Sequence, residues 1–217
     1  MARLTSPANH DCNPCANVDS PPMPVDSICV FCGSSFGRGS TYKAAAEALG
    51  MLLAERGITL VYGGARVGLM SAIADAVLSA GGRAVGVIPN SMLDHEIAHQ
   101  GLTKLHVVDS MHERKALMAI LSQAFIALPG GFGTFEEFCE ILTWGQLGLH
   151  QKPVALLNVD GYNNDLLALF DKSFNEQFIR TEHRRLIIQD ADPVKILNAF
   201  ASYQPPTVTK CLNPDET

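Results

Sequence analysis

The chain has 217 residues, of which 47% are apolar and 18% charged, and its formal net charge is −6 at pH 7. This length and composition are typical of one compact domain with a sizeable core, and the negative charge argues against a surface built for nucleic acid or an acidic membrane. Because every apolar run is shorter than the roughly 20 residues that span a bilayer, we expect a cytoplasmic protein with neither nucleic-acid nor membrane partners.

The two ends of the chain differ in composition from the middle. Residues 1–26 are rich in Pro, Asn, Asp and Ser and lack the apolar stretch of a secretory signal, so we interpret them as a disordered tail. Residues 204–217 have the same loose character. The folded domain is therefore predicted to span residues 27–203.

Four of the six cysteines form two CxxC pairs, Cys12 with Cys15 and Cys29 with Cys32. Four thiolates at such spacing can hold a structural zinc ion. Cys29 and Cys32, however, lie in an apolar run that reads as a strand, where residues three apart point to opposite faces. We therefore favour buried, apolar thiols over a zinc ribbon for this second pair.

Between the tails, short apolar runs alternate with longer helical patterns. The strands are predicted at residues 28–33, 58–64, 83–89, 105–109, 124–131, 153–159 and 185–190. The helices are predicted at residues 40–56, 67–81, 110–122, 134–147, 164–176 and 192–203. Apolar strands separated by helices indicate a parallel sheet covered on both faces. The fold class is thus α/β, a single Rossmann-like, doubly wound sheet, in which ligands bind at the carboxyl ends of the strands.

Three glycine-rich turns follow predicted strands: CGSSFGRGS at 32–40, YGGARVGLM at 62–70 and PGGFGT at 129–134. None of them matches the dinucleotide pattern GxGxxG in its expected place, and none matches the P-loop pattern GxxxxGK[ST]. Glycines before a helix start let a phosphate approach free backbone N–H groups. The turns therefore favour a nucleotide or sugar-phosphate site that carries neither a dinucleotide nor a Mg-ATP signature.

The turn at 129–134 is followed by two carboxylates, Glu136 and Glu137. Thr134 and Glu137 have the spacing of a capping box, which would explain one glutamate without any ligand. Alternatively, a glutamate beside a bound ribose 5-phosphate would face C1′, where cleavage of the bond to a base develops positive charge. This second interpretation makes the stretch suitable for hydrolysis of a nucleotide's N-glycosidic bond.

Arg114 and Lys115 are expected in the first turns of a helix that Ser110 and Glu113 cap. Cations at that end oppose the helix dipole, so both side chains are either solvated or face an anion. If the strands before this helix and the 134–147 helix were neighbours, both helix starts would face one crevice. Arg114 would then clamp the phosphate with two hydrogen bonds.

The segment HEIAH at 95–99 is a literal HExxH zinc-protease motif. The motif needs a stable helix, whereas this segment is a short link between two predicted strands. The extended pattern would also need Gly at 102 and His at 105, and the chain has Gly101 and His106 instead. We therefore predict no metal site here.

The motifs YGGxxxGLM, MHERKA, PGGFGTFEE and TWGQLGLHQKP together resemble the LOG (Lonely Guy) family of cytokinin-activating phosphoribohydrolases, also labelled lysine decarboxylase-like. The resemblance extends from about residue 28 to about residue 200. It implies cofactor-free hydrolysis of N6-modified adenosine 5′-monophosphates to free base and ribose 5-phosphate. It also implies homodimers or larger homo-oligomers.

Carried over residue by residue, the resemblance makes Arg114 and Glu137 the catalytic pair. It implies substrate-binding positions at Glu96, Lys115, Gly130, Gly131, Phe132, Gly133, Thr134, Phe135, Glu136 and Thr143. The chain departs from the family pattern at Ala65, where a third glycine is usual, and at Ser71, where a glycine is usual. Both changes bear on which base is preferred.

Two other functions compete with this one. A non-catalytic nucleotide or cofactor carrier would use the same glycine-rich turns but would not require the Arg114–Glu137 pair. A zinc hydrolase would use the HEIAH segment. The decarboxylase label adds no further candidate, because neither Lys152 nor Lys172 stands in a recognisable pyridoxal-phosphate context.

Overall fold

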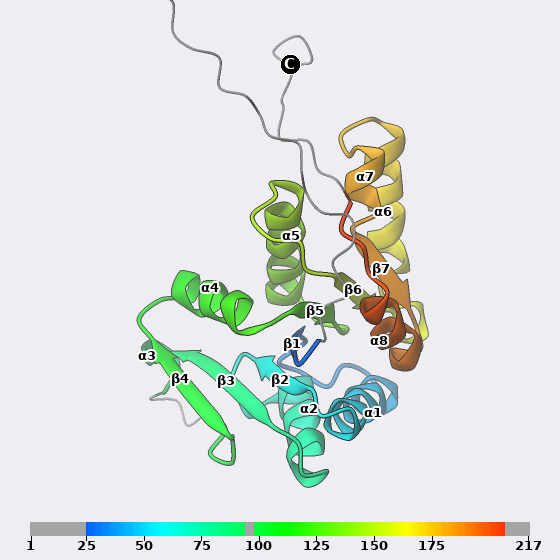
Figure 1. Ribbon diagram of the computed structural model, residues 1–217. Coiled ribbons are helices and arrows are strands. Elements are labelled where there is room, and N and C mark those ends of the chain that lie inside the picture. The colour runs from blue at the N-terminus through cyan, green and yellow to red at the C-terminus, as the bar shows by residue number, and fades with distance from the viewer. Residues whose placement is uncertain (1–24, 94–97, 207–217) are drawn as a thin grey trace, which may run out of the picture.

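A computed structural model describes residues 25–93 and 98–206 of the chain (Figure 1). All the strands are parallel and form one sheet in the order β4-β3-β2-β1-β5-β6-β7. The strands are β1 (Ser27–Phe31), β2 (Thr59–Tyr62), β3 (Ala84–Pro89), β4 (Lys104–Val108), β5 (Ala124–Ala127), β6 (Val154–Leu157) and β7 (Ile187–Asp190). The predicted doubly wound α/β fold is confirmed. Each predicted strand is present; β4 keeps its predicted length but is shifted by one residue, and the others are shorter than predicted.

Helices cover both faces of this sheet (Figure 1). The long helices are α1 (Thr41–Glu55), α2 (Gly68–Ser79), α4 (Met111–Leu121), α5 (Phe132–Gln146), α6 (Asn164–Asn175) and α8 (Pro193–Ala201). The sequence reading missed three short elements: α3 (Asn90–Leu93), η1 (Val159–Gly161) and α7 (Thr181–Arg184). Each is too short to show an apolar period. None of the described helices is both long and apolar enough to span a membrane.

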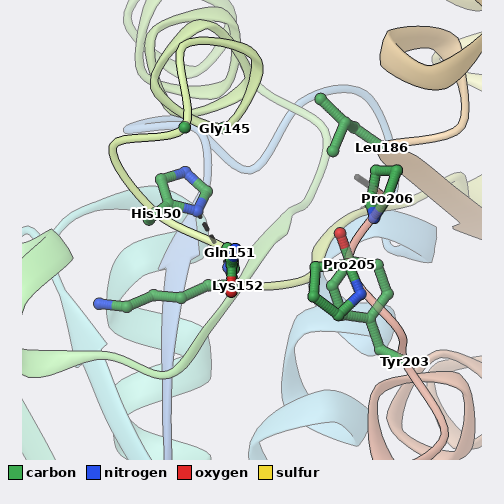
Figure 2. A pocket seen from close by; sticks show the side chains of 9 residues that line it. Gly145, His150, Gln151, Lys152, Leu186, Tyr203, Pro205 and Pro206 are labelled. Atoms are coloured by element: carbon green, nitrogen blue, oxygen red, sulfur yellow. Dashed lines mark hydrogen bonds between the residues drawn. The ribbon is translucent and has the colours of Figure 1, made fainter. Parts of the chain in front are cut away.

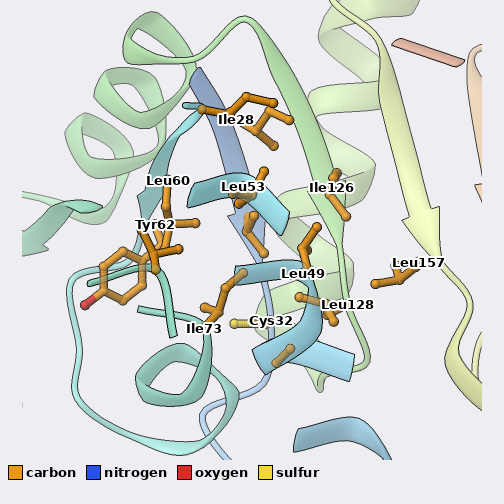
Figure 3. Packing of buried hydrophobic residues seen from close by; sticks show 14 of the residues in the cluster. Ile28, Cys32, Leu49, Leu53, Leu60, Tyr62, Ile73, Ile126, Leu128 and Leu157 are labelled. Carbon is orange, nitrogen blue, oxygen red and sulfur yellow. The ribbon is translucent and has the colours of Figure 1, made fainter. Parts of the chain in front are cut away.

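The apolar core consists of two layers, one on each face of the sheet. On one face, Ile28, Leu60 and Ile126 pack against Leu49 of α1 and Ile73 of α2 (Figure 3). On the other face, alternate residues of the same strands pack against α4, α5 and α6. This two-sided burial explains why the central strands read as continuous apolar runs rather than as alternating ones.

The cysteine pair in the first strand follows the same alternation. Cys29 is buried in the layer beneath α4 and α5, and Cys32 in the layer beneath α1 and α2. Both are free thiols, and burial raises the pKa of each well above its usual value. The two side chains point to opposite faces, as predicted. The other pair, Cys12 and Cys15, lies outside the described residues.

Candidate functional site

The carboxyl ends of β1 and β5 define the place where a ligand is expected. These strands are neighbours, but the chain continues from β1 toward β4 and from β5 toward β7, so the loops that follow them diverge. The two loops meet at their bases, where the Gly33 N–H donates to the Pro129 carbonyl oxygen over 3.1 Å. A Cβ at Gly130 would lie 2.9 Å from the Gly33 backbone nitrogen across the two loops and 2.1 Å from Thr134 Oγ1, so this close approach requires glycine.

Helix α5 begins two residues earlier than predicted. Gly131 is its N-cap in an extended conformation, and Phe135 N–H donates to the Gly131 carbonyl oxygen over 3.1 Å. Thr134 is therefore the third residue of the helix, and the predicted capping box with Glu137 is wrong. The N–H groups of residues 132–134 have no acceptor within the helix, and the helix dipole is positive here. This end of α5 can therefore hold an anion.

The start of α4 was predicted correctly. Ser110 is its N-cap, and its Oγ accepts a hydrogen bond from the Glu113 N–H over 3.1 Å. The strands that precede α4 and α5 are not neighbours, however, because β3, β2 and β1 lie between β4 and β5. The helix starts are brought together differently, because α4 crosses the sheet from β4 toward β5 (Figure 1). The Arg114 side chain on α4 thereby reaches Glu137 on α5.

Arg114 and Glu137 form a buried ion pair. Arg114 Nη1 donates to Glu137 Oε1 over 3.1 Å, and Arg114 Nε donates to the carbonyl oxygen of Val87 over 3.2 Å. The remaining nitrogen, Nη2, lies against Gly63, where a Cβ would stand 2.0 Å away from it. From the sequence we expected Arg114 to bind the phosphate with two hydrogen bonds. In this arrangement its guanidinium is not free to do so.

Both side chains of this pair are 11% exposed. Burial raises the pKa of the Glu137 carboxyl above its usual value, although the Arg114 charge acts in the opposite direction. A carboxyl group whose pKa is raised is a better proton acceptor once it is ionised. The pair is thus suited to receiving a proton and to stabilising nearby positive charge in a site that excludes most water.

Lys115 lies beside the pair but points to other carboxylates. Its Nζ is 3.0 Å from Glu140 Oε2 and also donates to Glu136 Oε1. Burial disfavours the charged ammonium, yet the hydrogen bonds to these two carboxylates outweigh it and raise the pKa of Lys115. Lys115 and Glu136 therefore contact each other rather than the anion-binding end of α5.

The other predicted substrate contacts are not all brought together. Gly130, Gly131, Gly133 and Thr134 lie at the start of α5, where Phe132 is 93% exposed and Phe135 is half-buried. Thr143 is exposed and donates from Oγ1 to the Cys139 carbonyl oxygen over 2.8 Å. It follows Glu137 by six residues, about 9 Å along the helix axis. Glu96 lies outside the described residues.

The HEIAH segment falls partly outside the described residues, but its last histidine is placed. His99 is buried; its Nδ1 accepts from the Gly101 N–H over 3.0 Å, and its Nε2 donates to Asp75 Oδ1 over 2.9 Å. Both ring nitrogens are thus engaged by protein groups. Among residues 25–93 and 98–206, no three His, Cys, Asp or Glu side chains gather where they could hold a metal.

A hollow of about 190 Å³ lies at the opposite edge of the sheet, beside the amino ends of β6 and β7 (Figure 2). His150, Lys152 and Tyr203 are among the residues that line it. His150 donates from Nε2 to the Ile141 carbonyl oxygen over 2.8 Å and accepts at Nδ1 from the Lys152 N–H. Lys152 Nζ donates to the Ala119 carbonyl oxygen over 2.7 Å. The polar groups of His150 and Lys152 are therefore engaged within the fold, and we assign the candidate site to the other edge.

Sequence reasoning missed two residues of the candidate site. Gly63 was seen only as part of a glycine-rich turn, although its lack of a side chain makes room for the Arg114 guanidinium. Tyr162 gave no signal at all, yet its hydroxyl donates to the Gly130 carbonyl oxygen over 2.5 Å. Contacts between residues so far apart in the chain leave no local pattern in a single sequence.

A doubly wound sheet with an open helix N-terminus and a buried Arg–Glu pair near its topological switch point is the arrangement of an α/β protein whose candidate site can hold an anionic ligand. Residues 70–200 match the family model described as "Possible lysine decarboxylase". The chain is 51% identical over 82% of its length to "Probable cytokinin riboside 5'-monophosphate phosphoribohydrolase LOGL5" of Oryza sativa subsp. japonica, and covers 73% of that protein. It is 48% identical to "Cytokinin riboside 5'-monophosphate phosphoribohydrolase LOG7" of Arabidopsis thaliana, with 82% of each chain covered. The chain therefore belongs to this family, and the resemblance to LOG proteins is confirmed.

Solved structures share the fold at lower identity. A molybdenum cofactor binding protein from Rippkaea orientalis aligns with a TM-score of 0.63 and 23% identity, over 83% of this chain and 98% of its own. The "Moco Carrier Protein" of Chlamydomonas reinhardtii aligns with a TM-score of 0.59 and 23% identity, over 80% of this chain and 97% of its own. At this level of identity the likeness concerns the fold alone.

Proposed function

We propose that this chain is an N-glycosyl hydrolase that cleaves adenosine 5′-monophosphates, including N6-modified ones, to the free base and ribose 5-phosphate. The observation that carries the proposal is the buried Arg114–Glu137 pair beside the open N-terminus of α5. The phosphoribohydrolases of rice and Arabidopsis, about half identical to this chain, support the same reaction. The catalytic domain corresponds to residues 27–203.

The geometry suggests how the substrate lies. The phosphate is held by the backbone N–H groups at the start of α5 and by the close turn at Gly130 and Gly131. Glu137 follows Phe132 by five residues, about 7.5 Å along the helix axis. That separation is comparable with the distance from the phosphorus of a ribose 5-phosphate to its C1′. A phosphate at the helix end therefore brings C1′ near the Glu137 carboxylate.

Glu137 and Arg114 then have distinct tasks. As the bond between C1′ and the base breaks, its electron pair leaves with the base and positive charge develops on the ribosyl ring. The ionised Glu137 stabilises that charge and accepts a proton from the water that attacks C1′. The departing base takes up a proton from solvent, and Glu137 later returns the proton of the attacking water to solvent, so that one water molecule is consumed overall. Arg114, fixed by Val87 and Gly63, holds the Glu137 carboxylate in place and favours its ionised form.

The test is an HPLC assay of the purified protein with AMP and with isopentenyladenosine monophosphate. We expect equal amounts of base and ribose 5-phosphate, with release lost in Glu137→Gln and strongly reduced in Arg114→Ala. Near-wild-type turnover in both variants would remove the assignment of the catalytic pair. Tight nucleotide binding without base release on long incubation would instead identify a carrier.

We also propose that the active form is a homodimer or larger homo-oligomer. Thr143, a substrate contact in the resemblance, lies on the exposed side of α5, and Leu147 and Leu149 just beyond are 53% and 67% exposed. Light scattering after gel filtration measures the assembly, and a monomer at working concentration would contradict this proposal. The free thiols of Cys29, Cys32 and Cys139 suit a reducing, cytoplasmic location, which cell fractionation tests.

A further inference from the structure

The phosphate-binding turn is held from outside by a tyrosine that comes from a distant part of the chain. Tyr162 follows η1, and its hydroxyl donates to the carbonyl oxygen of Gly130 over 2.5 Å. Gly130 precedes the N-cap of α5. This contact joins the carboxyl end of β6 to the turn after β5, and neither strand requires it for its own pairing.

The contact acts on one particular peptide unit. In a trans peptide the C=O of one residue and the N–H of the next point in opposite directions. The Tyr162 hydroxyl, by binding the Gly130 carbonyl oxygen, therefore directs the Gly131 N–H away from itself. Because neither Gly130 nor Gly131 has a Cβ, the peptide between them can rotate at little steric cost. The hydroxyl supplies an orientation that the two glycines do not supply themselves.

The position of Tyr162 is itself determined by an unusual turn. Asp160 and Gly161 both have left-handed backbone conformations, with φ of 52° and 68°. The Asn158 side chain closes this turn by accepting from the Asn163 N–H over 2.8 Å, and Asn163 is 2% exposed. A non-glycine residue in this region is strained, and such strain persists where the surroundings hold it.

The Tyr162 ring is also supported from the side. Tyr42 of α1 meets it edge to face, with ring centroids 5.6 Å apart. The Tyr42 hydroxyl makes no hydrogen bond within the described part of the chain, so this neighbour contributes its ring alone. Deleting the hydroxyl of Tyr162 and deleting that of Tyr42 are therefore matched changes. The two rings are in contact, but only the Tyr162 hydroxyl is hydrogen-bonded to the turn.

We propose that Tyr162 is a positioning residue for the substrate phosphate, which it acts on by orienting the Gly130–Gly131 peptide. The inference rests on the proposed function for the identity of the ligand. A contact to phosphate is the same in the ground state and the transition state, since the reacting bond is at the other end of the ribose. Loss of the hydroxyl therefore raises KM and leaves kcat nearly unchanged.

The experiment compares Tyr162→Phe with Tyr42→Phe. Calorimetric titration with ribose 5-phosphate should give a Kd about three- to tenfold higher in Tyr162→Phe, as expected for one lost hydrogen bond, and an unchanged Kd in Tyr42→Phe. The KM for the nucleotide should rise by the same factor while kcat stays within about twofold. A merely structural defect would instead lower kcat through a smaller active fraction, and Tm measurements on all three proteins check folding.

Each other outcome has one meaning. The inference is overturned if the Kd of Tyr162→Phe stays within twofold of wild type, or if the Kd of Tyr42→Phe rises equally. It is also overturned if the wild-type protein does not bind ribose 5-phosphate. If wild type binds ribose 5-phosphate without releasing base from nucleotides, and Tyr162→Phe weakens that binding, the positioning role holds while the proposed hydrolysis fails.

Discussion

Gly63→Ala is the substitution that tests the catalytic pair most directly without touching either member. A Cβ at residue 63 would stand 2.0 Å from Arg114 Nη2 and 3.2 Å from Met70 Sδ. The backbone of Gly63 is not in the left-handed region, so alanine causes no backbone strain there. The guanidinium must therefore move, and we expect this movement to disturb its hydrogen bonds to Val87 and Glu137.

The size of the effect follows from those two bonds. A hydrogen bond that involves a charged group contributes about 1.5–3 kcal/mol. Disturbing the two bonds that align Glu137 is therefore expected to cost about 3 kcal/mol of transition-state stabilisation. At about 1.4 kcal/mol per factor of ten, we expect kcat/KM to fall roughly 100-fold. Overpacking also destabilises the fold, by about 1–3 kcal/mol. Steady-state assays of base release and urea unfolding measure the two effects separately.

The matched control is Gly145→Ala, which adds the same methyl group near the other end of α5. Its nearest neighbour would be His150 Cε1 at 3.3 Å, and Gly145 lies at the edge of the sheet away from the candidate site. We expect near-wild-type kcat/KM there. If Gly63→Ala kept kcat/KM within twofold of wild type, the fixed position of Arg114 would have no catalytic importance, and the role given to the Arg114–Glu137 hydrogen bond would be refuted.

Three further predictions concern neighbouring residues. Burial raises the pKa of Glu137, and the proposed mechanism needs the ionised carboxylate. In a pH profile, kcat should therefore fall as the pH drops through a pKa above that of a free glutamate. A profile that is flat down to pH 4.5 would contradict this. Lys115→Met leaves two carboxylates without their shared cation, so we expect the free energy of unfolding, measured in urea, to fall by about 1–2 kcal/mol. An unchanged unfolding midpoint would show that solvent screens these ion pairs. Ser110→Ala removes the cap of α4 and should cost about 1 kcal/mol in the same measurement, with Ser110→Thr as the conservative control.

Much of this protein could be read from local patterns in its sequence. The apolar runs predicted the central strands β1, β2, β3, β5 and β6, because strands buried on both faces carry no polar alternation. The edge strands β4 and β7 were predicted too, although they are partly exposed. The Ser110 cap of α4 was predicted from the spacing of Ser110 and Glu113 alone. The motif around Glu137, together with Arg114, indicated the family to which the chain belongs.

The local sequence pattern was misleading at the start of α5, because backbone geometry determines where this helix begins. Thr134 and Glu137 have the spacing of a capping box, yet the helix begins at Phe132 because Gly131 takes the extended N-cap conformation. The sequence contains both possible starts, and only the turn against Gly33 selects one of them. The consequence is functional: Glu137 is released from capping and turns inward to Arg114.

The tertiary structure alone decided how the site is assembled. Arg114 reaches Glu137 although their helices follow strands that are separated by three others, because α4 crosses the sheet between them. Gly63 makes room for the guanidinium, and Tyr162 reaches back to the Gly130 carbonyl oxygen from beyond β6. The sequence by itself determined which elements form and which chemistry they carry, since those depend on neighbours along the chain. Which side chains meet depends on the strand order, and that order is set by packing over the whole sheet.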